Sequence, residues 1–124
     1  MEKIIIEETE DTPQIELDKS NDIFEITGRS LPENAPGFYE PVQKWLTEYI
    51  QDPNPFTEFL FKLEYFNSAS AKQLLEILIK LEQIAETGKD VKVVWYFIKE
   101  DDLMESRGEE LKSMVDIRFE LKAY

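Results

Sequence analysis

The stretch FTEFLFKLEYFNSASAKQLLEILIKL, residues 56–81, contains two apolar patterns with different periods. In residues 56–66 the apolar side chains largely alternate, which is typical of a β-strand that places Phe59, Phe61, Leu63 and Tyr65 on one side. From about Ser70 the spacing changes to three and four residues, the period of a helix with one apolar face. A strand that leads directly into a helix is the building unit of an α/β fold.

The rest of the chain predicts strands and helices on both sides of this unit. Short connections between the first three strands favour an antiparallel meander. The first helix begins between Asn34, a good capping residue, and Phe38, whereas the last helix is weak because Arg107–Gly108 interrupts it. The predicted strands cover residues 3–7, 12–18, 23–28, 56–66, 91–98 and 117–122, and the predicted helices cover residues 34–50, 70–86 and 102–113.

This order of elements predicts an α/β fold with a single mixed β-sheet, in which an N-terminal antiparallel meander is followed by crossover helices. Each crossover joins two parallel strands and is right-handed by the usual rule. Residues 91–98 are apolar at nearly every position, so we expect a central strand covered on both faces. Because 124 residues is close to the commonest domain size, residues 1–124 are expected to form one domain.

The composition excludes several classes of function. The absence of cysteine and histidine excludes disulfides, Cys/His zinc sites, cysteine nucleophiles and serine–histidine triads. A net charge of −13, with 14 basic and 27 acidic residues, would repel nucleic acid and anionic lipid. No apolar run is long enough to span a membrane, and the acidic N-terminus lacks a signal-peptide pattern, so we expect a cytoplasmic protein.

Motifs for catalysis or metal binding are weak or absent. The acidic pairs Asp101–Asp102 and Glu109–Glu110 are sequence neighbours, whereas a magnesium site needs oxygens that converge from separate elements. Neither GxxxxGK[ST], GxGxxG nor GxSxG occurs. We therefore expect no enzymatic activity, no metal and no cofactor. The aromatic residues follow strand and helix periods and predict core packing, with Tyr39 and Tyr65 as candidates for the rim of a partner surface.

The junction between strand and helix is rich in hydroxyl side chains. Ser70–Ala71–Lys72–Gln73 matches a capping box, so we expect Ser70 to cap the helix, with Gln73 reaching back. Asn67 and Ser68 would then lie just outside the helix, where a phosphate on Ser68 would meet the positive end of the helix dipole. Serines that only cap helices are common, so these residues alone leave both interpretations open.

A second candidate lies in the predicted loop at Gly28–Arg29–Ser30. Arg29 is one of three arginines in the chain. Its guanidinium could form an ion pair within this acidic chain, or it could hold a phosphate or a partner carboxylate through two parallel hydrogen bonds. The sequence leaves both roles open.

Two long segments carry a resemblance to a known family. GRSLPENAPGFYEPVQKWLTEYI, residues 28–50, and FKLEYFNSASAKQLLEIL, residues 61–78, resemble the bacterial SiaC family of small regulatory phosphoproteins of biofilm and surface-signalling switches. The match extends over nearly the whole chain. The family fold is similar to that of STAS domains, the anti-sigma-factor antagonists, whose phospho-accepting serine also begins a helix after a strand.

The resemblance implies that Ser68 is the phospho-acceptor, because the family's phosphorylated threonine or serine follows the motif Y-[FL]-N. It further implies a Ser/Thr protein kinase, a PP2C-type phosphatase, and an output protein, such as a diguanylate cyclase, that binds the unmodified form. Serine in place of threonine at position 68 keeps the same chemistry. The residues expected to bind partners are Arg29, Ser30, Asn67, Ser68 and Ser70.

Two other classes of function compete with this partner-switching hypothesis. One is a small-molecule binding module or enzyme that uses a groove around Arg29, Asn67 and Ser68. The other is a structural interaction domain whose serines only cap a helix.

Overall fold

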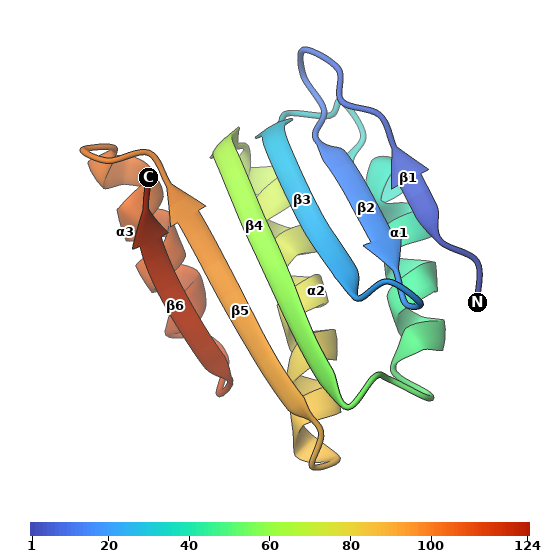
Figure 1. Cartoon of the computed structure of the whole chain (residues 1–124). Coiled ribbons are helices and arrows are strands. Elements are labelled where there is room, and N and C mark those ends of the chain that lie inside the picture. Colours follow the sequence, from blue (N-terminus) through green and yellow to red (C-terminus); the bar gives the residue numbers. More distant parts are fainter.

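The computed structural model describes residues 1–124, which form one six-stranded β-sheet and three helices (Figure 1). The strands are β1 Ile4–Ile6, β2 Gln14–Asp18, β3 Ile23–Ser30, β4 Phe56–Phe66, β5 Asp90–Phe97 and β6 Arg118–Ala123, and the helices are α1 Ala35–Tyr49, α2 Ser68–Glu86 and α3 Asp102–Lys112. The strands lie side by side in chain order, antiparallel from β1 to β3 and parallel from β3 to β6. The predicted α/β fold with one mixed sheet and an N-terminal meander is confirmed.

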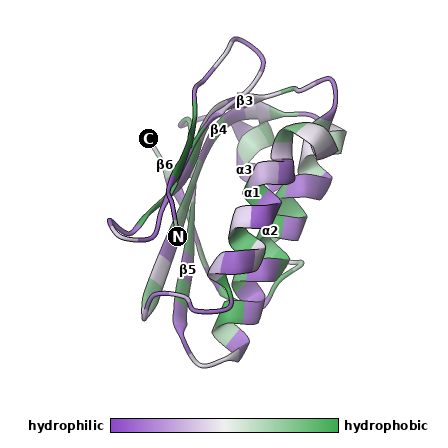
Figure 2. Ribbon diagram, turned by 90° about the vertical axis from the view of Figure 1, so that its right-hand side faces the viewer, coloured by the Kyte–Doolittle hydropathy of each residue, from purple (hydrophilic) through white to green (hydrophobic).

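All three helices cover the same face of the sheet (Figure 2). Each crossover steps to the next strand in the same direction, so connections of one hand place every helix on one side. The prediction that residues 91–98 form a strand covered on both faces is therefore wrong. The aliphatic residue of β5 on the open face, Val94, is only 4% exposed because Leu60 of β4 and Glu120 of β6 lie beside it in register.

The hydrophobic core lies between the sheet and the helix layer. It is rich in aromatic rings: the centroid of Tyr49 of α1 is 5.1 Å from that of Phe24 and 5.2 Å from that of Trp45. Helix α1 begins at Ala35, within the predicted range, and Asn34 is its cap, since its carboxamide oxygen accepts the N–H of Gly37 at 3.2 Å. Helices α1 and α2 both present their apolar stripes to the strands, as the spacing of their apolar residues predicts.

Strand β4 does not keep its alternation to the end. In the register with β3, Gly28 pairs with Leu63 but Arg29 pairs with Tyr65, so Glu64 is an extra residue of the kind found in a β-bulge. Beyond this irregularity Phe66 turns into the core and is 2% exposed, whereas Tyr65 is only half-buried. The prediction that Tyr65 shares the core-facing side with Leu63 is therefore corrected.

Helix α3 is continuous through Arg107 and Gly108, so the predicted interruption does not occur. Glycine is needed there for packing, since a Cβ atom at position 108 would lie 2.5 Å from Cδ1 of Trp95. The Trp95 indole N–H also donates to the carbonyl of Met104 at 3.1 Å, which fastens α3 to β5. No helix of the structure combines the length and apolar character that crossing a membrane requires.

Candidate functional site

The junction between β4 and α2, residues 66–70, is a tight corner in which Asn67 is the capping residue. Asn67 has an extended backbone, and its side-chain oxygen accepts the N–H of Ser70 at 2.9 Å. The prediction that Ser70 caps the helix with Gln73 reaching back is therefore wrong, since Gln73 instead accepts the side-chain N–H of Gln43 of α1 at 3.1 Å. Ser68 becomes the first residue of α2.

A buried group of hydroxyls fastens this corner to the end of β3. The Ser30 hydroxyl shares hydrogen bonds with the hydroxyls of Tyr39, at 2.7 Å, and Ser70, at 2.8 Å. The Ser30 carbonyl accepts the Ser70 hydroxyl and the Asn67 N–H, each at 3.1 Å. We name Ser30, Tyr39 and Ser70 the hydroxyl triad. Because it joins β3, α1 and α2, it holds the backbone on either side of Ser68 in one conformation.

The structure separates the five residues predicted to bind partners into two groups. Ser30 and Ser70 are 0% exposed, so their side chains support the corner from inside. Ser68 is exposed and Asn67 half-exposed, and both stand at the surface of the corner. Arg29 is also exposed, but it precedes the inward-facing Ser30 and pairs with Tyr65 of β4, and so points to the open face of the sheet.

Tyr39 is the member of the site that sequence reasoning missed. It was a candidate for the rim of a partner surface, but it is 0% exposed and belongs to the hydroxyl triad. Its position three residues before Val42 and seven before Leu46, on the buried side of α1, is a signal that fits burial. The hydrogen bonds that link Tyr39 to Ser30, and Ser30 in turn to Ser70, leave no such signal, because they depend on how β3 and α2 meet.

Removing the Asn67 cap should destabilise the protein more than changing its exposed neighbour. Asn67→Ala is expected to cost about 1 kcal/mol of unfolding free energy, because the N–H of Ser70 loses its acceptor. Ser68→Ala should change it by less than about 0.5 kcal/mol, because this side chain is exposed. Urea denaturation of both variants checks this. Equal losses for the two variants would contradict the assignment of Asn67 as the cap.

Burial raises the pKa of Tyr39 to about 12 from its ordinary value of 10.0, although the hydrogen bond with Ser30 opposes this shift. Since the neutral phenol is the form that the fold accommodates, its contribution to stability is complete below pH 10 and is lost as the pH rises from 10 to about 12. We expect wild-type protein to lose more unfolding free energy between pH 9 and 12 than Tyr39→Phe, by an amount on the order of 2 kcal/mol. The unfolding free energies of both proteins are measured by denaturation at each pH. If wild type and Tyr39→Phe lose the same amount between pH 9 and 12, ionisation of Tyr39 does not cause the loss of stability at high pH.

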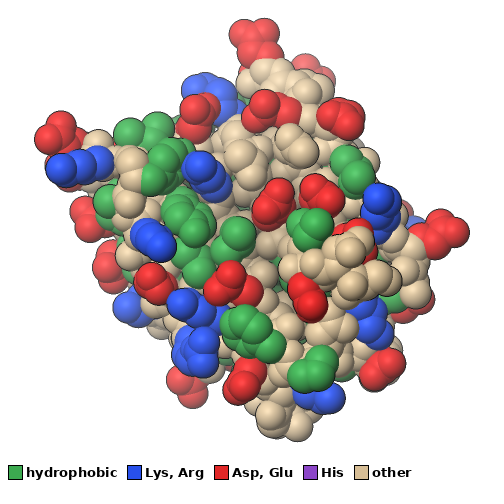
Figure 3. All heavy atoms as spheres, in the orientation of Figure 1, with side chains coloured by type: hydrophobic (Ala, Val, Ile, Leu, Met, Phe, Trp, Pro, Cys, Tyr) green, Lys and Arg blue, Asp and Glu red, His purple; other side chains and the backbone are tan.

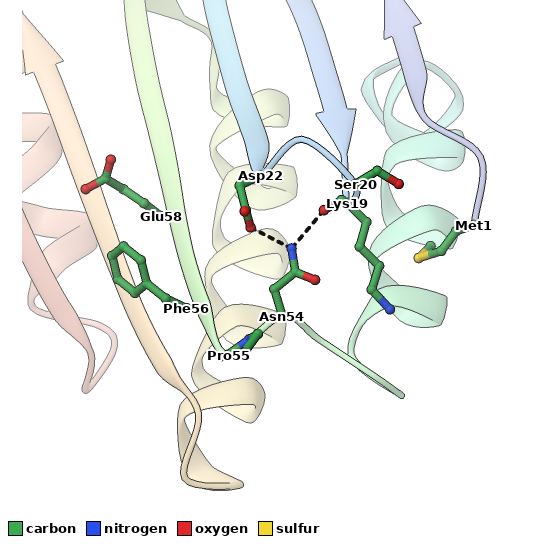
Figure 4. Close-up of a pocket in the computed structure, with 8 residues that line it drawn as sticks. All are labelled: Met1, Lys19, Ser20, Asp22, Asn54, Pro55, Phe56 and Glu58. Carbon is green, nitrogen blue, oxygen red and sulfur yellow. Dashed lines mark hydrogen bonds between the residues drawn. The ribbon is translucent and has the colours of Figure 1, made fainter.

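The pocket of the structure lies at the other end of the sheet (Figure 4). It is lined by the β2–β3 turn and the start of β4, and an 11-residue strand separates it from the corner by roughly 33 Å. Within it the Asn54 amide donates to the carbonyl of Lys19 at 2.9 Å and to the carboxylate of Asp22 at 2.7 Å. These polar groups therefore tie two loops together. No three Asp or Glu side chains are grouped so that they could hold a metal ion.

The corner thus presents the exposed hydroxyl of Ser68 between residues that are hydrogen-bonded to the rest of the fold. Such a hydroxyl is suited to covalent modification and to recognition by another protein. A profile described as "SiaC family regulatory phosphoprotein" matches residues 6–124. The chain is 26% identical over 124 residues to an uncharacterized protein of Pseudomonas aeruginosa, covering 100% of this chain and 98% of that one.

Solved structures agree with this match. SiaC of Pseudomonas aeruginosa superposes with a TM-score of 0.90 at 26% identity, covering 100% of both chains. A chain in the crystal structure of the diguanylate cyclase SiaD in complex with its activator SiaC, from the same organism, gives a TM-score of 0.92 at 26% identity over 98% of this chain and 99% of that one. The protein therefore belongs to the SiaC family of regulatory phosphoproteins.

Proposed function

We propose that this protein is a non-catalytic partner switch controlled by phosphorylation of Ser68. The observation that carries the proposal is the position of Ser68, which is exposed at the first residue of α2 while the residues around it are fastened to β3. A protein kinase can therefore reach the hydroxyl. The new phosphate would stand on a surface whose backbone has little freedom to move away.

The physical effect of the phosphate should fall on partners more than on the fold. It adds about −1.5 to −2 charges at the end of a helix where free N–H groups favour negative charge. The domain itself should therefore tolerate the modification. A partner docked over the corner would instead have to desolvate a dianion, which weakens binding unless the partner supplies cations.

The relatives suggest the kind of output. SiaC of Pseudomonas aeruginosa is described as the activator of the diguanylate cyclase SiaD and has been crystallised with it. By analogy, the unmodified form of this chain binds and activates a diguanylate cyclase, a Ser/Thr protein kinase modifies Ser68, and a PP2C-type phosphatase restores the unmodified form. The small-molecule alternative has less support, because Arg29 points to the open face while Ser68 stands on the helix side.

Reconstitution tests the proposal. Purified protein is incubated with candidate kinases and ATP, its mass is measured, and each form is added to a diguanylate cyclase from the same organism. We expect the unmodified form to raise the rate of cyclic di-GMP production, the phosphorylated form to raise it much less, and the phosphatase to restore the effect. Equal binding and stimulation by both forms would refute the switch. Nucleotide turnover by the protein alone that persists after repurification would refute the non-catalytic assignment.

A further inference from the structure

Strands β4 to β6 have one face that no helix covers, and the charges on this open face differ in balance from those of the whole chain. Four of the 14 basic residues project from this face on three adjacent strands, Lys62, Lys92, Arg118 and Lys122, and they balance the four acidic residues there, Glu58, Glu64, Asp90 and Glu120. Figure 3 shows lysine and arginine side chains mixed with acidic and hydrophobic ones over these strands. Because the chain carries a net charge of −13, this is a surface on which an acidic partner meets comparatively little repulsion.

Two lysines and two tyrosines on this face form one cluster. The Lys62 ammonium lies 4.4 Å from the ring centroid of Tyr124 and 6.0 Å from that of Tyr96, and the Lys122 ammonium also lies 6.0 Å from that of Tyr96. The two rings meet edge to face at 6.2 Å. We name these four residues the lysine–tyrosine cluster. Aromatic rings that hold ammonium groups in place reduce the entropy that a partner must remove on binding.

Both ammonium groups of the cluster lack an anionic partner. The ion pairs of the structure involve Lys19, Lys44 and Lys92. Of these, only Lys92 lies on the same strands as the cluster, and its ammonium is 3.1 Å from the carboxylate of Glu120. Glu64 lies at the edge of the cluster, where its charge adds to the effect of burial in raising the pKa of Tyr124. The two lysines therefore remain available to carboxylates from outside the chain.

We infer that the lysine–tyrosine cluster is a docking surface for an acidic, extended segment of a partner protein. Lys62 and Lys122 stand in register on either side of Tyr96, so their backbones are two strand spacings, about 10 Å, apart. A polyproline-type segment with a glutamate at every third position carries carboxylates on one side at intervals of about 9 Å. Tyr124, 47% exposed, and Tyr96 offer ring surface to the residues between them.

This surface is separate from the proposed switch. The cluster lies on the open face of the sheet, whereas Ser68 lies in the helix layer beyond the end of β4. Binding to the cluster should therefore occur equally with unmodified and phosphorylated protein. If Ser68 proved not to be a switch, the test of the docking surface would be unaffected. If the cluster bound no acidic segment, the test of the switch would be unaffected.

The test uses ¹⁵N-labelled full-length protein and a blocked peptide with the repeat Glu-Pro-Pro. Addition of the peptide should shift the amide resonances of β4 to β6 next to the cluster. Replacing glutamate by glutamine in the peptide should abolish the shifts. Lys62→Glu combined with Lys122→Glu should weaken binding about tenfold or more, since each lost pair contributes up to about 1 kcal/mol. Lys44→Glu combined with Lys112→Glu, which makes the same change in net charge on the helices, should leave binding unchanged.

Several results would overturn the inference. Shifts scattered over the surface, or equal weakening by both double variants, would show a general effect of charge. Tighter binding of a thymidine decanucleotide than of the peptide would assign the cluster to single-stranded nucleic acid instead. Sedimentation equilibrium that shows a dimer dissociated by Lys62→Glu would assign it to a second copy of the chain.

Discussion

Ser68→Ala is expected to abolish phosphorylation by the cognate kinase and to leave the protein permanently in its partner-binding form. The substitution removes the hydroxyl that accepts the phosphate, while the Asn67 cap and the hydroxyl triad are untouched. Intact-protein mass after incubation with kinase and ATP should show no added phosphate. Affinity for the output protein should equal that of the unmodified wild type, whether or not the kinase is present.

Ser68→Asp should weaken partner binding only in part. An aspartate carries one negative charge and lacks the third oxygen of a phosphate, so it imposes a smaller desolvation cost on a docked partner. Ser106→Ala is the matched control, because this serine is also exposed on a helix but lies on α3. If Ser68→Ala gains one phosphate at the wild-type rate, or if only Ser106→Ala loses it, the assignment of Ser68 is wrong.

The largest loss of stability is expected for Trp95→Ala, at about 3–5 kcal/mol. Trp95 is 0% exposed, and its ring contacts those of Phe61, Phe66 and Phe119 at centroid distances of 5.6, 5.8 and 6.5 Å. Its removal leaves a cavity and takes away the hydrogen bond to Met104 that fastens α3. Loosening of α3 should therefore accompany the loss of global stability.

The denaturant midpoint of Trp95→Ala, compared with that of Phe56→Ala, measures this effect. Phe56 is 43% exposed at the start of β4, so its truncation should cost far less. Hydrogen exchange should also show faster opening of the amides of α3 in Trp95→Ala than in wild type. A midpoint for Trp95→Ala close to that of wild type would show that this ring does not hold the core together.

Much of the fold could be predicted because the local sequence patterns and the lengths of the connections both indicate the same strands and helices. Alternation in β4, the three-and-four spacing of α2 and the cap at Asn34 each depend on residues close together in the chain. The irregularity at Glu64 could not be predicted in the same way. It arises from the pairing of β4 with β3, and only that pairing exchanges Tyr65 for Phe66 in the core.

At the candidate site, contacts between residues far apart in the chain override a local capping pattern. The position of Ser68 at the start of a helix followed from the sequence, but the identity of the cap did not. A capping box starting at Ser70 is plausible locally, yet the Ser70 hydroxyl is taken up by Ser30, 40 residues away, so Asn67 caps the helix instead. A buried hydroxyl needs a partner, and the nearest partner in space here belongs to another element.

The sequence by itself determined the elements, their order, the mixed sheet and the exposed serine at the strand-to-helix corner, because these depend on local periodicity and on connections between neighbours. Only the tertiary structure decided that all helices lie on one face, that Gly108 lies against Trp95, and that Ser30, Tyr39 and Ser70 meet. Each of these depends on contacts between residues far apart in the chain. Such contacts are selected by the packing of whole elements, and no short stretch of sequence encodes them.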